Sequence, residues 1–490
     1  MAKIRFDFNN MFSHSVGIKH GVTDKDLAAI APAAKKAFAH IQKIAANQTN
    51  RINLGLEWMR LPYQDKEMIS KLQRLGDEIA AKYENVISLG IGGSYLGLKA
   101  AQDALRLPYY NDFSSVRQGR PKIYFEGNNL DPETLGVLLN NLDPKKTFVI
   151  VISKSGETTE TKAAFAIVEE WLKTGAGREY GRQVIAITDP ASGTLRKKVK
   201  EGQSKDPQSF RSLPVMKGVG GRFSELNIGL LHLAIIGVAI QEVLDGAASM
   251  LKRCSQQALS RNPALMYACI HTILYKKKSK SIAVMMPFSE TLKSTADWYV
   301  QLLAESLGKK YSRKITVAED GMERWLADHG KAVNTGRTPI PARGTNDLHS
   351  IQQNNIEGMN NKAVTFIKIE GFRSDIELRG TNDFLSGQRF SKLLSTAEEA
   401  TEWALAKESR PSCTIVMPKV TPFFWGELIL FFEMATAYEG ELLNVNAYDQ
   451  PGVEGYKNYM YYKLKKPGLP EEIVKEIYEN PLMKKSKYVI

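Results

Sequence analysis

The chain has 490 residues, which is more than one hydrophobic core usually supports, so we expect two domains. Its composition, 43% hydrophobic and 24% charged, is typical of a globular protein in water, and no apolar run reaches the roughly 18 residues of a membrane span. Three scattered cysteines, never spaced as CxxC, and an N-terminus without the apolar core of a secretory signal lead us to expect a cytoplasmic protein.

The formal net charge of +13 raises the question of a nucleic-acid or membrane partner. Lysines gather at 276–280 and 484–487, where they could contact an anionic surface. We find no zinc-knuckle spacing, no aromatic ribonucleoprotein motif and no continuous basic helix. We therefore predict solvated surface charge, with no nucleic-acid and no membrane partner, and a positive field that attracts a small anionic substrate.

The first part of the chain predicts helices and then alternating strands and helices. Apolar residues spaced by three and four predict helices over 19–60 and 63–82. Short apolar runs predict strands, and helical segments such as 160–174 separate them. The predicted strands are 85–90, 122–126, 148–152 and 183–188. This alternation predicts a parallel sheet with crossover helices.

A second series of the same kind follows. It begins with helices over 229–244 and 263–275 and ends with a long helix over 422–438 and a polar tail. Its predicted strands are 281–286, 314–317, 363–369 and 414–418. We predict an α/β protein with a helical N-terminal segment, two α/β domains, helices that connect them and a C-terminal segment. The predicted boundaries are 1–62, 63–228, 229–262, 263–440 and 441–490, in that order.

The segment Thr147–Thr161, TFVIVISKSGETTET, passes from an apolar run to a turn rich in hydroxyls. Five consecutive apolar residues, 148–152, are typical of a buried parallel strand. The turn that follows places hydroxyls beside the free amides of a helix N-terminus, an arrangement that suits a phosphate monoester. The alternative is a capped helix with a polar loop, which the segment alone does not exclude.

A glycine-rich turn, Gly90-Ile91-Gly92-Gly93-Ser94, follows the predicted strand 85–90. It is not a dinucleotide fingerprint, because Tyr95 occupies the third glycine position, and it is not a P-loop, because Leu98-Lys99 follows Gly97. A tight turn remains that lets the backbone approach a ligand. Because this turn and the hydroxyl-rich turn both end strands of one sheet, they favour a phosphorylated small molecule.

Arg222 lies in the turn Val219–Ser224, GVGGRFS with its preceding glycine. A single arginine usually forms a surface ion pair. Beside two turns that bind anions, it could instead stabilise developing negative charge.

Six motifs in order resemble the glucose-6-phosphate isomerase (phosphoglucose isomerase) family over nearly the whole chain. They are LGIGGSYLG, VISKSGETTET, GVGGRFS, QLLAESLGK, GTNDLHSIQQ and the most specific, AYDQPGVEGYK at Ala447–Lys457. The resemblance implies two sugar-isomerase (SIS-type) αβα sandwich domains with mainly parallel sheets and helical extensions at both termini. It also implies a cytoplasmic homodimer of glycolysis and gluconeogenesis that interconverts glucose 6-phosphate and fructose 6-phosphate through a cis-enediolate, without cofactor.

The resemblance implies a role for each matched residue. Glu305 corresponds to the base that moves a proton between C2 and C1, and Arg222 to the arginine that stabilises the enediolate. His349 and Lys457 correspond to the groups that open the sugar ring, and the histidine belongs to the neighbouring subunit's site. The positions that match the family's substrate-binding residues are Gly93, Ser94, Ser153, Lys154, Ser155, Thr158, Gln301 and Gln450.

The proposed chemistry is consistent without the family name. A carboxylate removes the proton next to a carbonyl, and a cation stabilises the oxygen as it becomes anionic. The sequence has no HExxH motif and its seven histidines are scattered, so we expect no metal. Taken singly, Glu305 could be a solvated helix carboxylate, His349 a loop cap and Lys457 a surface lysine.

Two other functions remain as alternatives. A sugar-phosphate sensor would keep the phosphate site and lack the acid and base, which the presence of Glu305, His349 and Lys457 disfavours. An isomerase of mannose or amino-sugar phosphates would share the fold, and the segment 449–457 disfavours it.

Overall fold

The computed structural model describes residues 2–319, 321–380 and 382–490. The chain forms two compact units, of which the first ends at Ala447 and the second is Tyr448–Ile490. The first unit contains two mainly parallel sheets with helices on their faces, so the predicted α/β fold class is confirmed. No helix of the described ranges is both long and apolar enough to cross a bilayer.

The first sheet contains five parallel strands in the order β3-β2-β4-β5-β6. These strands are β2 (Asn85–Leu89), β3 (Lys122–Glu126), β4 (Thr147–Ile152), β5 (Val184–Thr188) and β6 (Arg211–Pro214). Every residue of β2, β4 and β5 is buried, as their apolar runs predict. The strand order reverses between β2 and β4, which is where open α/β sheets bind ligands.

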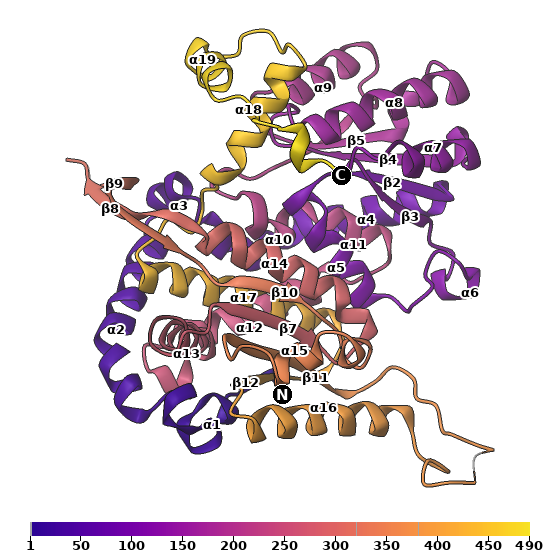
Figure 1. Ribbon diagram of the computed structural model, residues 1–490. Coiled ribbons are helices and arrows are strands. Elements are labelled where there is room, and N and C mark those ends of the chain that lie inside the picture. Colours follow the sequence, from indigo (N-terminus) through magenta and orange to yellow (C-terminus); the bar gives the residue numbers. More distant parts are fainter. Residues whose placement is uncertain (1, 320, 381) are drawn as a thin grey trace. The chain divides into compact units, whose positions relative to one another are not determined.

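Helices cover both faces of the first sheet (Figure 1). One face carries α7 (Pro132–Asn141), α8 (Thr159–Ala176) and α9 (Thr194–Lys205), and the other α4 (Lys66–Lys82), α5 (Leu96–Leu105) and α11 (Leu230–Ile235). Val149 and Val151 of β4 pack with Phe165 and Val168 of α8 in one apolar core. Apolar packing thus fixes the start of α8 beside the end of β4.

The second sheet has the order β1-β12-β11-β7-β10. Its strands are β1 (Arg5–Asp7), β7 (Ile282–Pro287), β10 (Thr338–Pro341), β11 (Lys362–Gly371) and β12 (Ser412–Lys419). Only β1 among them is antiparallel to its neighbour. Leu405 of α16 (Phe390–Lys407) packs in a core with Val284 and Phe366 on one face of the sheet.

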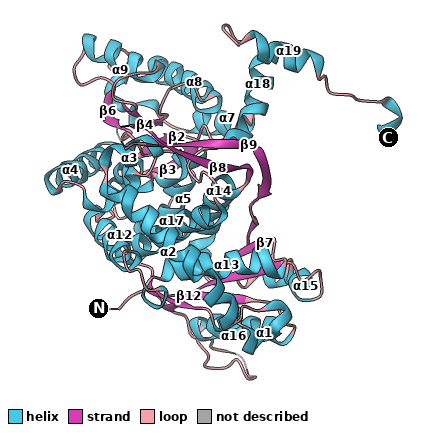
Figure 2. Cartoon of the chain, turned by 90° about the vertical axis from the view of Figure 1, so that its left-hand side faces the viewer, coloured by secondary structure: helices cyan, strands magenta, loops and turns pink. Residues whose placement is uncertain are grey.

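A group of helices lies between the two sheets (Figure 2). It includes α12 (Ile240–Cys254), α13 (Pro263–Lys278), α14 (Lys293–Leu307) and α17 (Pro422–Leu443). Nearly every residue of α17 is buried, and this helix is largely apolar, with a few buried glutamates. Helix α14 contacts α5 of the first sheet and β10 of the second, so it links the two sheets.

The remaining elements are shorter or lie outside the sheets. The first unit adds α1 (Ser13–His20), α2 (Asp24–Ala46), α3 (Gln48–Leu54), α6 (Ser114–Arg117), α10 (Glu225–Ile228), α15 (Gln352–Ile356) and the hairpin of β8 (Lys309–Val317) and β9 (Glu323–Thr335). The second unit contains α18 (Glu454–Lys463) and α19 (Glu471–Glu479).

Two expectations about single elements need correction. The segment 229–244 is not one helix, because α11 ends at Ile235 and Gly237 has φ +76°, a left-handed conformation that stops a helix. The strand predicted at 314–317 is part of β8, which pairs with β9 in a separate antiparallel sheet. The helical extensions predicted at both termini are present: the C-terminal one contains α18 and α19, and the N-terminal one also contributes β1.

Candidate active site

The buried side chain of Arg222 organises the candidate site. Arg222 lies in a short 3₁₀-helix, Gly221–Phe223, and its side chain is 2% exposed. Its Nη1 is 3.0 Å from Oε2 of Glu305, its Nε donates to Oγ of Ser306 at 2.7 Å, and its Nη2 donates to the carbonyl of Ala447 at 2.7 Å. These contacts hold the guanidinium in one orientation before any ligand binds.

Glu305 lies near the end of α14, and its side chain is 28% exposed. Gln301, one turn earlier on the same helix, donates from Nε2 to Oε1 of Glu305 at 3.2 Å. Nζ of Lys309 donates to the backbone carbonyl of Glu305 at 2.8 Å. The carboxylate is therefore held by a buried cation and an amide, while solvent still reaches it. A base with these properties can exchange a proton with a bound ligand.

The glycine-rich turn after β2 packs directly against the Arg222 loop. A Cβ on Gly93 would lie 2.0 Å from the carbonyl oxygen of Gly221, and a Cβ on Gly92 would lie 2.9 Å from Nε2 of Gln301. Only glycine permits this approach of the two backbones. Ser94 belongs to the same turn and is half-buried. The motifs that contain Gly93, Arg222 and Glu305 thus meet at one edge of the first sheet.

The hydroxyl-rich turn follows β4, the neighbour of β2. The buried Ser153 accepts the N–H of Gly156 at 3.0 Å, and Ser155 accepts that of Glu157 at 3.1 Å. Thr158 is the N-cap residue of α8, and its hydroxyl makes no capping bond. The turn therefore presents hydroxyls and the free amides of a long helix to the same edge, which favours binding of a phosphate dianion.

Lys154 has an exposed side chain, and it stabilises this turn through its backbone carbonyl. Its carbonyl accepts the Thr188 hydroxyl at 3.1 Å and the N–H of Asp189 at 3.1 Å. These bonds tie the end of β4 to the end of β5.

The other two predicted catalytic residues, His349 and Lys457, lie on elements other than those that carry Arg222 and Glu305. His349 is exposed in the 3₁₀-helix Asn346–His349, and within the described ranges no hydrogen bond joins it to another predicted site residue. Lys457 belongs to α18 of the second unit, where its Nζ is 2.9 Å from Glu454. Burial lowers the pKa of Lys457, but its bond to Glu454 outweighs this effect and raises it. Gln450 lies in the same unit.

The prediction missed two groups that hold Arg222. Ser306 directly follows the predicted base Glu305. Its position in the sequence could therefore have indicated that it lies at the same site. The carbonyl of Ala447 leaves no trace in the sequence, because any residue could supply it.

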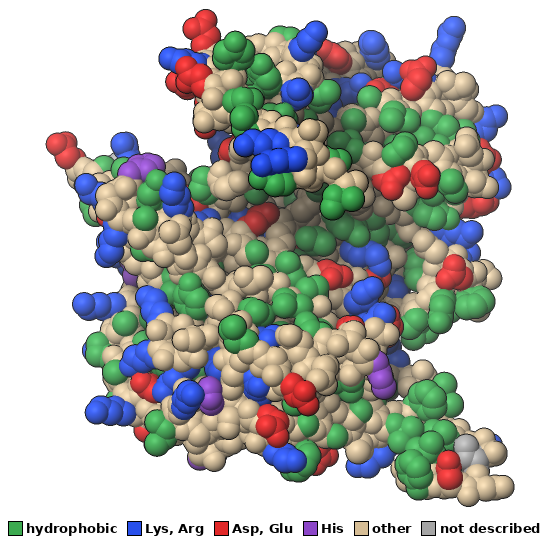
Figure 3. Space-filling view, viewed as in Figure 1, with side chains coloured by type: hydrophobic (Ala, Val, Ile, Leu, Met, Phe, Trp, Pro, Cys, Tyr) green, Lys and Arg blue, Asp and Glu red, His purple; other side chains and the backbone are tan. Residues whose placement is uncertain are grey.

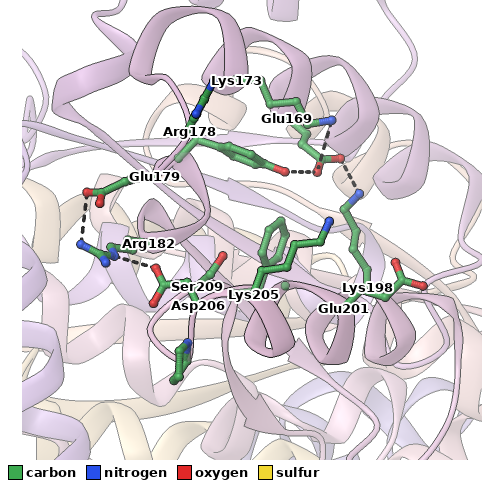
Figure 4. A pocket seen from close by; sticks show the side chains of 14 residues that line it. Glu169, Lys173, Arg178, Glu179, Arg182, Lys198, Glu201, Lys205, Asp206 and Ser209 are labelled. Carbon is green, nitrogen blue, oxygen red and sulfur yellow. Dashed lines mark hydrogen bonds and ion pairs between the residues drawn. The ribbon is translucent and has the colours of Figure 1, made fainter.

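A separate cavity of about 690 Å³ lies among α8, α9 and the short helix Tyr180–Gln183 (Figure 4). Its charges largely pair with one another: Glu169 with Lys198 at 2.6 Å and Arg182 with Asp206 at 2.7 Å. No predicted site residue lines it. We therefore place the candidate active site at Arg222 and Glu305.

Charge and metal-binding potential were also predicted from the sequence. Figure 3 shows Lys and Arg side chains scattered among Asp and Glu on one face of the molecule, without a single basic stripe. Within 2–319, 321–380 and 382–490, no group of three or more His, Cys, Asp or Glu side chains could hold a metal ion. Independence from nucleic acid, metal and cofactor stays a prediction.

Comparison with known proteins gives consistent matches. The family model described as phosphoglucose isomerase matches residues 65–360 and 387–468. The glucose-6-phosphate isomerase of Carboxydothermus hydrogenoformans is 37% identical over 476 residues, which is 96% of each chain. That of Shouchella clausii is 32% identical over 96% of this chain and 98% of its own.

Two solved structures share the fold. A hypothetical protein of Thermus thermophilus, TT0462, is 30% identical, with a TM-score of 0.78, over 94% of this chain and 99% of that chain. A glucose-6-phosphate isomerase from Chlamydia trachomatis has a TM-score of 0.72 over 94% of this chain and 90% of its own. It is 22% identical, so it bears on the fold alone.

Proposed function

Because the chain belongs to the phosphoglucose isomerase family, we propose that it interconverts D-glucose 6-phosphate and D-fructose 6-phosphate. The observation that carries this proposal is the contact of 3.0 Å between the buried Arg222 and the partly exposed Glu305. This contact supports the proposal because a carboxylate suited to act as base lies beside a cation suited to stabilise an oxyanion, next to two turns that suit a phosphate.

Proton transfer is assigned to Glu305. Its carboxylate takes the proton from C2 of the open-chain aldose and returns it to C1. The hydroxyl proton passes from O2 to O1, so the carbonyl group moves from C1 to C2. A cis-enediolate forms between the two steps. Arg222 stabilises the negative oxygen, and because its bonds to Ser306 and Ala447 already fix it, little reorganisation is needed at that moment. No electrons enter or leave the substrate.

Substrate binding is assigned to the two turns. Ser94, Ser153, Ser155 and Thr158 supply hydroxyls for the phosphate, the backbones of Gly93 and Lys154 approach it, and the N-terminus of α8 adds amides and a favourable dipole. Gln301 contacts the sugar beside Glu305, and sugar binding is also assigned to Gln450.

Ring opening is assigned to Lys457 and to His349, and His349 serves the site of a second copy of the chain. The exposure of His349 and its lack of a bond to Glu305 or Arg222 within the described ranges support this arrangement. The functional form is then a homodimer, because each site is incomplete without its partner. We place the enzyme in the cytoplasm, in glycolysis and gluconeogenesis.

The test is an assay on fructose 6-phosphate in excess chelator, coupled to oxidation of the glucose 6-phosphate formed. Wild-type protein should turn over, and Glu305→Gln should lose at least about 100-fold in kcat. Glu408→Gln, an exposed substitution of the same kind, is the matched control and should leave kcat unchanged. An inactive wild type that still binds sugar phosphate would identify a sensor and overturn the proposal.

A further inference from the structure

Two buried glutamates lie behind the candidate active site. Glu225 of α10 and Glu433 of α17 are each 2% exposed, and their carboxyl groups are within hydrogen-bonding reach of each other. Oε1 of Glu225 accepts the indole N–H of Trp298 at 2.7 Å, whereas its buried Oε2 has no donor among the described groups. An acceptor left without a donor in the interior is costly unless a proton supplies one.

The other buried acids of α17 differ from Glu433 in having basic partners. Glu439 is 2.7 Å from Arg337, Glu441 is 2.6 Å from Arg313, and Glu427 is 3.9 Å from Arg253. Within the described ranges, no Lys, Arg or His forms an ion pair with Glu225 or Glu433. Two adjacent negative charges without a cation cannot both persist in a buried site, so one proton must stay with the pair.

Apart from Glu433, the described contacts of the Glu225 carboxyl come from groups that do not titrate near neutral pH. Trp298 of α14 donates one hydrogen bond, Gly97 of α5 offers only backbone, and Ser224 contributes its backbone N–H. Burial raises the pKa of Glu225, and burial together with the charge of Glu225 raises that of Glu433.

Glu225 also lies close to the segments that carry Arg222, Glu305 and the glycine-rich turn. Glu225 follows Arg222 by three residues, and Trp298 lies on the same face of α14 as Gln301 and Glu305, at spacings of three and four. A Cβ on Gly97 would lie 2.2 Å from Cγ of Glu225, so this glycine of α5, just after the Gly92–Ser94 turn, makes room for the carboxyl. Displacement of the Glu225 side chain would therefore move the Arg222 loop relative to α14.

We infer that Glu225 and Glu433 share one proton and act as positioning residues, which hold the Arg222 loop against α14 so that Arg222 meets Glu305. This inference rests on the proposed isomerase function for its effect on rate. When alkaline pH removes the shared proton, the two carboxylates repel each other, the loop and helix separate, and kcat falls. The sugar phosphate never touches either glutamate.

The first experiment measures the proton directly, without reference to activity. Infrared difference spectra of the full-length wild-type protein, titrated from pH 6 upward, should show a protonated carboxyl band that disappears as pH rises. The band should be lost or displaced in Glu225→Gln and in Glu433→Gln, and unchanged in the exposed control Glu242→Gln. A wild-type spectrum without such a band at neutral pH would overturn the inference, whether or not the protein is an isomerase.

The second experiment measures kcat and KM against pH. Glu225→Gln keeps the shape of the side chain and a neutral hydrogen-bond donor, so its kcat at pH 7 should stay within about threefold of wild type. The decline of kcat at alkaline pH should occur at least half a pH unit higher in this variant than in wild type. Glu225→Ala should lose at least tenfold in kcat with little change in KM. If kcat of Glu225→Gln falls at the same alkaline pH as kcat of wild type, the positioning role is wrong. A protein with the infrared band and without isomerase activity would keep the pair and reject only the proposed function.

Discussion

The hydroxyl of Ser306 accepts a hydrogen bond of 2.7 Å from Nε of Arg222. Glu305 is the preceding residue of α14, and its Oε2 is 3.0 Å from Nη1 of the same guanidinium. Two consecutive residues of one helix therefore bind Nε and Nη1 of one arginine, and the carbonyl of Ala447 accepts a hydrogen bond from its Nη2. Because Arg222 is buried, this geometry does not depend on solvent, and the cation is orientated before substrate arrives.

Replacement of Arg222 by lysine should therefore not be conservative. A lysine keeps the charge but offers a single ammonium group, which cannot bond Ser306, Glu305 and the Ala447 carbonyl in their fixed directions. We expect Arg222→Lys to lower kcat by about 100-fold, with a smaller effect on KM, in the coupled assay. Arg389→Lys, which changes an exposed arginine 3.8 Å from Asp375, should leave both constants unchanged. A variant with wild-type kcat would show that only the charge matters.

The close approach of Gly93 to Gly221 gives a second prediction. A Cβ at position 93 would lie 2.0 Å from the Gly221 carbonyl oxygen, and a backbone atom cannot rotate away as a side chain can. We expect Gly93→Ala to push the turn from the Arg222 loop, to lower kcat by at least about tenfold and to destabilise the fold by about 1–3 kcal/mol. Denaturant unfolding and the coupled assay measure the two effects.

The matched control for Gly93→Ala is Gly136→Ala, in the middle of α7, where an added Cβ would meet nothing within 4 Å. Because alanine is the better helix former, this control should stabilise the protein by up to about 1 kcal/mol and leave kcat unchanged. Equal behaviour of the two variants would contradict the close packing of the glycine-rich turn.

These two contacts also show how far the sequence could predict the site. The strands β2 and β4 were predictable because each is an unbroken buried run, and their turns were expected at one edge because parallel strands end together. That Arg222 and Glu305 serve one site followed only from the resemblance to a family, and their ion pair was not predicted. Periodicity cannot pair residues that lie on different elements far apart in the chain.

The wrong predictions about single elements also arise because the sequence does not reveal contacts between distant segments. Strand β1 has only three residues and forms because β12 offers an edge, which nothing near residue 5 reveals. Strand β8 has the composition of a strand, but its partner is the following β9 and not the second sheet. At the break, Gly237 leaves room for the guanidinium groups of Arg106 and Arg120, which lie where its Cβ would be and come from distant parts of the chain. Glu225 and Glu433 were not paired for the same reason.

A third prediction concerns pH and stability. Nδ1 of His40 is 2.7 Å from Glu441 and Nε2 is 2.9 Å from Glu323, so both ring nitrogens face carboxylates and α2 is tied to α17 and β9. Burial lowers the pKa of His40, but its bonds to Glu441 and Glu323 outweigh this effect, and the net shift is upward from 6.5. The native state thus binds this proton more tightly than the unfolded chain does.

The stabilisation from His40 is therefore complete below about pH 6.5 and is lost as pH rises through the higher native pKa. In thermal unfolding between pH 6 and 9, the Tm of wild type should exceed that of His40→Gln by several degrees at pH 6, and the gap should shrink as pH rises. His14→Gln, at an exposed histidine, should show no such trend. A gap that widens with pH would mean that His40 is neutral in the native state.

The last prediction tests whether His349 serves the site of a second copy. If each site takes His349 from one subunit and Glu305 from the other, then His349→Ala and Glu305→Gln are each inactive but complement each other. After the two variants are unfolded together and refolded in equal amounts, half of the dimers should be mixed, and each should contain one complete site. Activity should then recover to about a quarter of wild type. The control is the same treatment of Glu408→Gln, whose side chain is exposed, with Glu305→Gln, where simple averaging is expected. If the two inactive variants stay inactive together although sedimentation shows mixed dimers, then His349 acts within its own chain and the shared site is wrong.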